Sequence, residues 1–297
     1  MLKTKTYPPS RFSRLSILFF RFFIQRLLPV SWFRAQLPST SQRHQKTDNL
    51  SLEIVSHCWQ YSNMLTYQLS SFVNHPPKKL SLTVTVFYSI EDEGTVDTLA
   101  YFSKLSPKNV TWNWQPLANG KLFRRGIGRN MAALTTKSDW IWYADCDIIF
   151  HENCLDSLAE QVKGKTDSLY FPRQEYTTEM LAESDPMLQA NAKPQVVEIK
   201  SENFSLFSRD KAKGAFQIVH GDVARAIGYC GKLSMFQTES GRWRKTYEDT
   251  AFKWLINSEG IPLEIAGVFQ IRHIKKGRYI KDSWVSKLRS KIRRIQE

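Results

Sequence analysis

Apolar and polar positions in the middle of the chain follow patterns that predict β-strands. Residues 80–88 alternate β-branched or apolar side chains with small polar ones and run into the acidic stretch 89–94, so we expect a strand followed by an acidic loop. Residues 140–144 form a continuous apolar run, which is typical of a strand buried on both faces. Residues 110–114 predict a further short strand.

Helical segments are expected between these strands, at residues 95–105 and again around 131–134. Alternation of strand and helix predicts an α/β fold, Rossmann-like, with a mixed and mostly parallel central sheet. In such sheets the ligand crevice lies beyond the carboxyl ends of the strands. The acidic loop after residue 88 and the acids that follow residue 144 therefore share one rim.

The two ends of the chain predict basic helical extensions. Residues 12–33 are apolar and aromatic but are interrupted by arginines, which favours a helix lying in a membrane interface over one spanning it. A signal peptide or a single N-terminal anchor remains the alternative. We expect a membrane-associating segment and linker over 1–49, one folded domain over 50–274, and a C-terminal helix over 275–297 that either anchors at the surface or packs on the domain.

Charge is concentrated at these ends. The chain has 297 residues, 42% of them hydrophobic, and a formal net charge of +14. Residues 1–46 hold nine Lys/Arg and no acid, and residues 275–297 hold nine Lys/Arg against two acids, which leaves the middle near neutral. Basic flanks on a neutral domain predict contact with an anionic membrane surface and no nucleic-acid partner.

Cysteine usage indicates the compartment. The four cysteines, Cys58, Cys146, Cys154 and Cys230, have no paired or metal-type spacing, which favours a reducing environment. Together with the basic ends, this predicts a peripheral protein on the cytoplasmic face of a membrane.

Asp145 and Asp147 follow the apolar run at 140–144 directly. Carboxylates at i and i+2 of a chain leaving a strand can turn toward one hard cation, and such a cation would neutralise the phosphates of a substrate. The alternative for such a pair is a solvated turn.

Four segments in a fixed order then point to a family: the Arg-Asn helix at 126–134, the Asp-x-Asp, the Glu-Asp pair before a helix at 248–255, and a late histidine. This series resembles the family 2 type of glycosyltransferase with the GT-A fold, over roughly residues 80–273. The resemblance implies that Asp145 and Asp147 lie at the donor diphosphate, with Asp147 favoured as the direct ligand of Mn²⁺ or Mg²⁺. It also implies catalytic roles for Glu248 and Asp249, Asp249 being the general base, and a metal or phosphate ligand at His273.

Physical reasoning leaves alternatives open for these acids and for the histidine. An acceptor hydroxyl that attacks an anomeric carbon needs a base, and Asp249 at a helix N-terminus would stay ionised. The spacing Thr246-x-x-Asp249 equally resembles a capping arrangement. A lone histidine after an apolar strand, such as His273, is often structural.

Donor contacts are expected at three further residues. Arg129 suits bidentate contact with phosphate or orientation of the acidic crevice, whereas Arg124 and Arg125 read as a solvated basic turn. Ser89 and Glu91, taken as following the first strand, are candidate base or ribose contacts, with a solvated turn as the alternative. The family's acidic turn after the second strand is missing from residues 112–117, which leaves the nucleobase open.

The predicted function is metal-dependent transfer of a sugar from a nucleotide-diphosphate donor, with a UDP-sugar favoured, to a hydroxyl of a lipid or glycan acceptor, with inversion. A phosphohydrolase would need Thr at Ile149, and a nucleotidyltransferase would need a glycine-rich phosphate loop where the acids at 91–93 stand. The remaining alternative is a non-catalytic membrane-surface binding or scaffold protein on the same fold.

Overall fold

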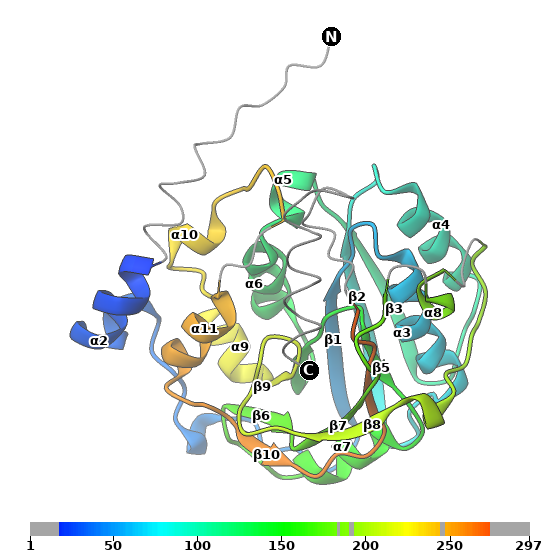
Figure 1. The fold of residues 1–297 in the computed structure, drawn as a ribbon. Coiled ribbons are helices and arrows are strands. Elements are labelled where there is room, and N and C mark those ends of the chain that lie inside the picture. Colours follow the sequence, from blue (N-terminus) through cyan, green and yellow to red (C-terminus); the bar gives the residue numbers. More distant parts are fainter. Residues whose placement is uncertain (1–17, 183–184, 190–192, 244–246, 274–297) are drawn as a thin grey trace.

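The computed structural model describes residues 18–182, 185–189, 193–243 and 247–273, and its centre is a seven-stranded sheet (Figure 1). The strand order is β10-β6-β9-β4-β1-β2-β3. Only β9 runs antiparallel to its two neighbours in this sheet. The strands are β1 (Leu50–His57), β2 (Leu80–Tyr88), β3 (Val110–Pro116), β4 (Trp140–Tyr143), β6 (Leu169–Pro172), β9 (Gln217–His220) and β10 (Ile261–Leu263).

A second sheet has four strands in the order β5-β11-β7-β8. They are β5 (Ile148–Phe150), β7 (Gln174–Thr177), β8 (Ser205–Ser208) and β11 (Val268–Gln270). β5 pairs antiparallel with β11, and β7 pairs parallel with β11 and antiparallel with β8. Because β5 begins directly after Asp147, this small sheet continues the chain from the carboxyl end of β4.

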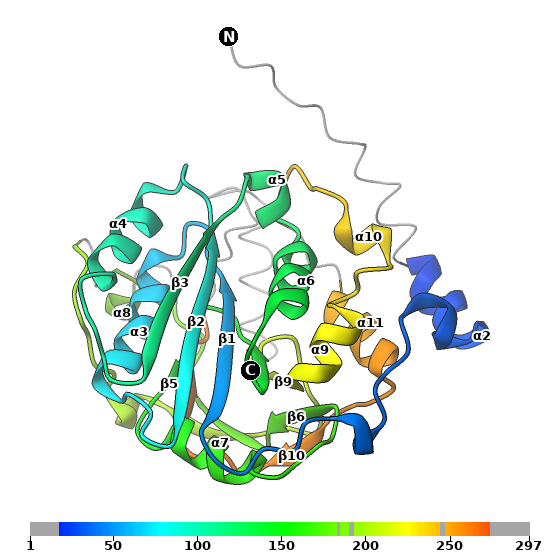
Figure 2. The ribbon, with the colours of Figure 1, turned by 180° about the vertical axis from the view of Figure 1, so that it is seen from behind.

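Helices cover both faces of the large sheet, which explains why its strands are apolar on both sides (Figures 1 and 2). One face packs on α3 (Ser62–Asn74), α4 (Glu93–Phe102), α7 (Cys154–Val162) and the short α8 (Pro186–Gln189). The other packs on α5 (Asn119–Leu122), α6 (Arg125–Thr135), α9 (Gly221–Ile227), α10 (Ser234–Gln237) and α11 (Glu248–Ile256). Each face has its own hydrophobic cluster, and all four residues of β4 are buried between them.

The topology places a ligand crevice beyond β1 and β4. From β1 the chain builds β2 and β3 on one side and then returns to add β4 on the other, so the strand order reverses between β1 and β4. In open α/β sheets the crevice lies at the carboxyl ends of the strands at this point. The mainly parallel sheet covered on both faces fits a Rossmann-like fold, and Asp145 emerges at the reversal.

The predicted strands at 80–88, 110–114 and 139–144 correspond to β2, β3 and β4. The numbering of the strands was wrong, because β1 (Leu50–His57) precedes them and lies between β4 and β2 in the sheet. The loop holding Ser89 and Glu91 therefore follows the second strand, so the second strand does end in an acidic turn. Residues 112–117, where that turn was expected, belong to the third strand. The helix expected at 131–134 begins earlier, at Arg125.

The described part of the N-terminal segment contains short helical turns that dock on the domain. These are the π-helical turn η1 (Phe20–Ile24), α2 (Gln25–Leu27) and the 3-10 turns η2 (Val30–Phe33) and η3 (Thr40–Gln42). Phe20 is fully buried and makes edge contacts with Phe33, Phe236 and Trp254. Among the described residues, no helix combines the length and the apolar character needed to cross a membrane. Residues 12–17 of the expected anchor and the whole helix expected at 275–297 lie outside the described residues.

Candidate functional site

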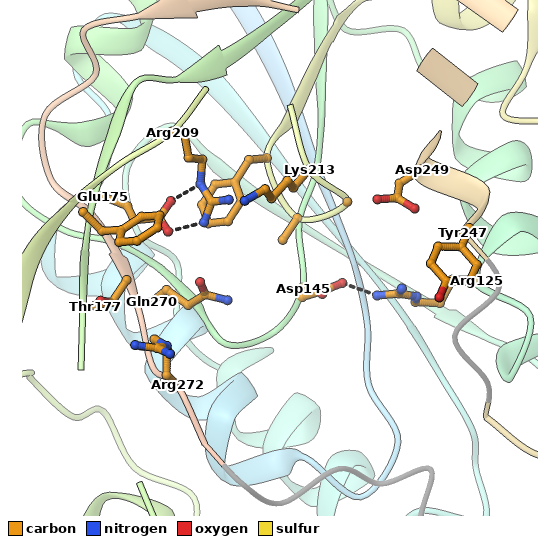
Figure 3. A pocket seen from close by; sticks show the side chains of 14 residues that line it. Arg125, Asp145, Glu175, Thr177, Arg209, Lys213, Tyr247, Asp249, Gln270 and Arg272 are labelled. Carbon is orange, nitrogen blue, oxygen red and sulfur yellow. Dashed lines mark hydrogen bonds and ion pairs between the residues drawn. The ribbon is translucent and has the colours of Figure 1, made fainter. Parts of the chain in front are cut away.

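A pocket of about 450 Å³ opens where the two sheets meet (Figure 3). Its walls come from the exit of β4, the first turns of α6 and α11, three strands of the small sheet and the loop before β9. The lining residues are Arg125, Asp145, Glu175, Thr177, Phe207, Arg209, Lys213, Gly214, Ala215, Phe216, Tyr247, Asp249, Gln270 and Arg272. Asp145 and Asp249, predicted from segments a hundred residues apart, thus line one cavity.

The charges of the pocket favour an anionic ligand. Four cations line it, namely Arg125, Arg209, Lys213 and Arg272, against three carboxylates, Asp145, Glu175 and Asp249. Two cations are neutralised locally: Arg125 by Asp145, and Arg209 by a two-pronged ion pair with Glu175 in which both side chains are buried. The Arg209 guanidinium also lies 3.8 Å from the centroid of the Phe216 ring. The pair therefore builds the wall, and the other cations face the cavity.

Arg125 connects the two acidic segments. Its Nη1 donates to Asp145 Oδ1 at 2.6 Å, and its Nε lies 3.3 Å from Glu248 Oε1. Burial lowers the pKa of the Arg125 guanidinium, but the facing carboxylates of Asp145, Glu248 and Asp249 raise it by more, so the net shift is upward. Arg125 therefore stays charged. The expectation that it belongs to a solvated basic turn was wrong, and Arg124 beside it is buried as well.

Arg129 supports the pocket from one helical turn further along α6. Its side chain is fully buried, with Nη1 donating to Tyr229 Oη at 2.9 Å and Nη2 to the Gly214 carbonyl at 2.8 Å. The guanidinium also lies 5.6 Å from the Tyr143 ring centroid and 5.3 Å from that of Tyr229. Its ion pair with Asp145 is long, at 3.5 Å. Of its two predicted roles, this placement suits orientation of the crevice, since Arg129 does not line the cavity.

Asp147, the second acid of the loop between β4 and β5, lies close to His273. Asp147 Oδ2 lies 3.8 Å from His273 Nε2 and 3.5 Å from Gln270 Nε2. His273 is buried and packs edge-on against Tyr61. A backbone hydrogen bond joins the two segments, because the Ile271 amide donates to the Asp147 carbonyl at 3.0 Å. Chain segments far apart in sequence thus bring the predicted ligands Asp147 and His273 together.

The spacing of these two side chains can be compared with the spacing of ligands around a divalent cation. Ligand atoms about 2.1 Å from one octahedral ion lie roughly 3.0 Å apart when adjacent and 4.2 Å apart when opposite. The observed separation of 3.8 Å between Asp147 Oδ2 and His273 Nε2 matches neither distance, so these side chains would have to shift to share one octahedral ion. Asp145, the third predicted ligand, instead holds Arg125 in this arrangement.

Asp249 lies in the first turn of α11, where the helix dipole favours an anion. The loop before β9 passes directly over its carboxylate. A Cβ built on Gly214 would lie 3.4 Å from Asp249 Cβ and 3.5 Å from its Oδ2, so glycine leaves the carboxylate open toward the cavity. Glu248, its neighbour, is buried and points to Arg125 instead. Thr246, the proposed capping residue, lies outside the described residues, and Tyr247 at the helix start makes no side-chain cap.

Ser89 and Glu91 lie on the same rim but outside the pocket lining. Ser89 is buried, and its Oγ accepts from the Glu91 amide at 3.1 Å, while the Glu91 carboxylate accepts from Asn119. The neighbouring Asp92 accepts from the Gln60 amide and from Thr95 at the start of α4. Since β1 separates β2 from β4, this loop is two strand spacings, about 10 Å, from Asp145.

The glycines of the segment 126–130 serve close packing of α6. A Cβ on Gly126 would lie 2.6 Å from the Phe236 carbonyl oxygen, and one on Gly128 would overlap Nε2 of His57. His57 ends β1, stacks on Phe87 and is buried. Burial first, and then the cations Arg129 and Arg125, lower the pKa of the His57 imidazole, so it is neutral at pH 7. The helix therefore lies directly on the end of β1.

The four cations of the pocket were not predicted as site residues from the sequence. Arg125 could have been found, because it lies four residues before Arg129 on the same helix face. Lys213, Arg209 and Arg272 could not, because Lys213 comes from a loop and the two arginines follow β8 and β11 of the small sheet, whose pairing is non-local.

No protein-family profile and no curated protein matches the sequence. Among solved structures, residues 1–349 of S. aureus TarS are similar to this chain, with 13% sequence identity and a TM-score of 0.43. The likeness covers 79% of this chain and 59% of that one, so this chain spans about three fifths of its length.

Proposed function

We propose that the protein is a metal-dependent glycosyltransferase of the GT-A type, which transfers a sugar from a nucleotide-diphosphate donor to a hydroxyl acceptor. One observation carries the proposal. A cavity with surplus cations holds Asp145 at the exit of the central strand β4 and Asp249 at the start of a helix. A diphosphate leaving group requires cations, and an incoming hydroxyl requires a base.

The donor would lie along the rim of the sheet. Arg125 and Lys213 would face the diphosphate, and the loop at Ser89 and Glu91 would receive the nucleoside end about 10 Å away. Asp147 and His273 would hold Mn²⁺ or Mg²⁺, which neutralises the departing diphosphate. Arg129 would keep its place behind Gly214 and Asp145 and fix the shape of the cavity.

Asp249 would act as the general base. Its carboxylate takes the proton of the acceptor hydroxyl while the acceptor oxygen forms a bond to the anomeric carbon. The bond from that carbon to the diphosphate oxygen breaks, and the electron pair leaves with the diphosphate. Arg125 and Lys213 stabilise the charge that develops there. Attack opposite the leaving group inverts the anomeric centre.

The acceptor or its carrier would be presented at an anionic membrane surface. Exposed apolar side chains gather on the N-terminal turns, namely Leu18, Phe19, Phe22, Phe23, Leu27, Leu28 and Trp32. Phe20 on the opposite side anchors these turns to α11 through Trp254. Aromatic residues beside arginines suit the headgroup layer of a bilayer, and a peripheral position on the cytoplasmic face follows as part of the proposal.

Donor binding and turnover test the proposal together. Binding of UDP-, GDP- and TDP-sugars is measured by calorimetry with and without Mn²⁺, and nucleoside diphosphate release is measured with a lipid or glycan acceptor panel. Asp147→Ala should weaken Mn²⁺-dependent donor binding at least tenfold. Asp249→Asn should keep donor binding but lower the rate by about 10²- to 10⁴-fold, as expected for loss of a general base.

Asp97→Asn on α4 is the matched control, because it makes the same change on an exposed position outside the pocket and should alter neither quantity. If none of the donors binds in a metal-dependent way, the transferase proposal fails and a non-catalytic membrane-surface protein becomes the better account.

A further inference from the structure

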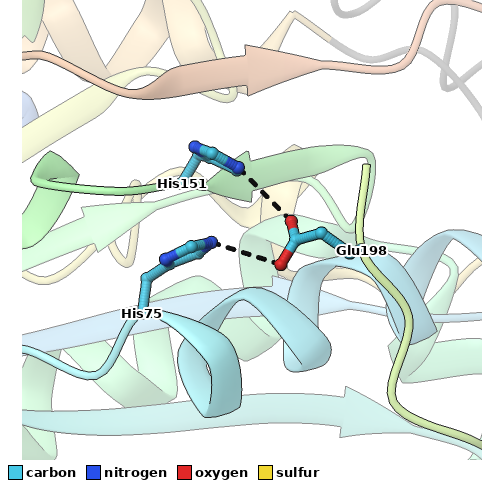
Figure 4. A group of neighbouring side chains, drawn as sticks. All are labelled: His75, His151 and Glu198. Atoms are coloured by element: carbon cyan, nitrogen blue, oxygen red, sulfur yellow. Dashed lines mark ion pairs between the residues drawn. The ribbon is translucent and has the colours of Figure 1, made fainter. Parts of the chain in front are cut away.

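A second group of ligand-type side chains lies away from the pocket (Figure 4). His75 ends α3, His151 follows β5, and Glu198 belongs to the segment that leads from α8 to β8. One ligand atom from each of the three lies within 4.8 Å of the others, and within the described residues this is the one such group of His, Cys, Asp and Glu. Three segments far apart in sequence therefore converge on one point.

The distances match those around a small metal ion. Nε2 of His75 lies 3.4 Å from Glu198 Oε2, and Nε2 of His151 lies 3.3 Å from Glu198 Oε1. Two ligands bound about 2.05 Å from a tetrahedral zinc ion lie roughly 3.3 Å apart. The two imidazole rings are 4.3 Å apart between centroids, so both nitrogens face the same carboxylate from one side.

The surroundings hold the three side chains in place. The Glu198 carboxylate accepts from Asn74 Nδ2 at 2.7 Å and from the Ile199 amide at 3.1 Å, contacts of the kind that orient metal-bound carboxylates. His75 Nε2 is shielded from solvent yet makes no hydrogen bond among the described residues, so a metal would satisfy it.

We propose that His75, His151 and Glu198 form a transition-metal site with an open fourth position, for which Zn²⁺ is the best-suited ion. Two imidazoles and a carboxylate are typical zinc ligands. The proposal does not depend on the proposed function. His151 and Asp147 stand at opposite ends of β5, about 13 Å apart along the strand, so the site is separate from the cation expected at Asp147.

Metal binding here would fasten the connection between β7 and β8. Those strands carry Glu175, Thr177 and Phe207 into the wall of the pocket. Without the metal, Glu198 holds its segment to α3 and β5 only through exchangeable polar contacts, because half of the Glu198 side chain is exposed. The ion would thus stabilise one wall of the pocket from a distance.

Zinc binding to the full-length protein tests this site without an activity assay. The protein is stripped with a chelator, equilibrated with Zn²⁺ in competition with a chromogenic chelator, and its bound zinc is measured by elemental analysis. We expect one Zn²⁺ per chain with a micromolar or tighter dissociation constant, and a rise in Tm of roughly 5 °C at saturating metal.

Variants identify the ligands. His75→Ala/His151→Ala should lower bound zinc at least tenfold, and Glu198→Gln should weaken it while keeping the size of the side chain. His44→Ala, which removes an exposed histidine, and Asp147→Ala, at the other expected cation site, should leave this zinc in place. Circular dichroism of each metal-free variant checks that it folds. Full zinc retention in the double variant, or no zinc bound by the wild type, would overturn the proposal and leave an ion-paired His-Glu cluster.

Discussion

Gly128→Ala should destabilise the protein, although alanine is the better helix former. Gly128 lies inside α6, where replacing glycine by alanine normally gains about 1 kcal/mol. Here the new Cβ would overlap Nε2 of His57 and lie 2.9 Å from Phe87 Cδ2. His57 is only 5% exposed and is stacked on Phe87, so neither ring can move aside without disturbing the end of β1.

The magnitude follows from the two opposing terms. Overpacking a buried site costs about 1–3 kcal/mol, which exceeds the gain in helix propensity in most of that range. We therefore expect a net loss of up to about 2 kcal/mol in the free energy of unfolding, measured by urea denaturation, and a Tm lower by up to roughly 8 °C.

Gly94→Ala is the matched control for this substitution. Gly94 lies in the first turn of α4, and its nearest new contact would be the rotatable hydroxyl of Ser62 at 3.1 Å. This change should be neutral or slightly stabilising. A His57→Ala background removes the overlap with His57 and leaves only the 2.9 Å contact with Phe87 Cδ2, so Gly128→Ala should cost less there. Equal stability of the Gly128→Ala and Gly94→Ala proteins would refute the close-packing account of the segment.

Three other perturbations have expected outcomes. Burial raises the pKa of the Glu53 carboxyl, and hydrogen bonds from Thr136 and Thr85 offset this only in part. The stability linked to Glu53 is therefore present below its unfolded pKa and is lost as pH rises. Glu53→Gln should raise the urea midpoint of unfolding at pH 7, and this gain should disappear near about pH 4. Arg129→Lys should lower unfolding free energy by about 1–3 kcal/mol in urea titrations, because lysine lacks the rigid fork. Replacing exposed Phe22 and Phe23 by Ser should reduce sedimentation with anionic vesicles at least tenfold, whereas Ser at the even more exposed Ile90 should not.

The two strands that flank β1 in the sheet, β4 and β2, were predictable, but β1 was not. β2 and β4 are recognisable because their buried positions carry apolar side chains. β1 carries Glu53, Ser56 and His57 at buried positions, and these polar groups interrupt the hydrophobic pattern. Glu53 accepts from Thr85 and Ser56 donates to Gln68, contacts that no local pattern reveals. Missing β1 shifted the strand numbering and created the false impression that the second strand lacked an acidic turn.

The candidate site was predictable only where it depends on strand ends and helix starts. Asp145, Asp147 and Asp249 occupy such positions, and a parallel sheet brings strand ends to one rim whatever the rest of the chain does. The cations on the opposite wall come from the small sheet, whose strands pair across gaps of up to about 120 residues, as β5 does with β11. Long-range pairing of this kind depends on the packed core and leaves no local mark in the sequence.

Arg125 contacts both halves of the pocket. Its guanidinium contacts Asp145 on the strand side and Glu248, the neighbour of Asp249, on the helix side. Under the proposed function, a donor diphosphate entering the cavity competes with Asp145 for this guanidinium. When the diphosphate binds the Arg125 guanidinium, Asp145 loses its ion pair and can turn toward Asp147, where a divalent cation would hold it. Donor binding and completion of the cation site would then be one linked step. Arg125→Gln should weaken donor binding but not Mn²⁺ binding without donor, because Asp145 is then already released, and the dependence of each affinity on the other ligand should shrink, as calorimetry with each ligand alone and with both can measure.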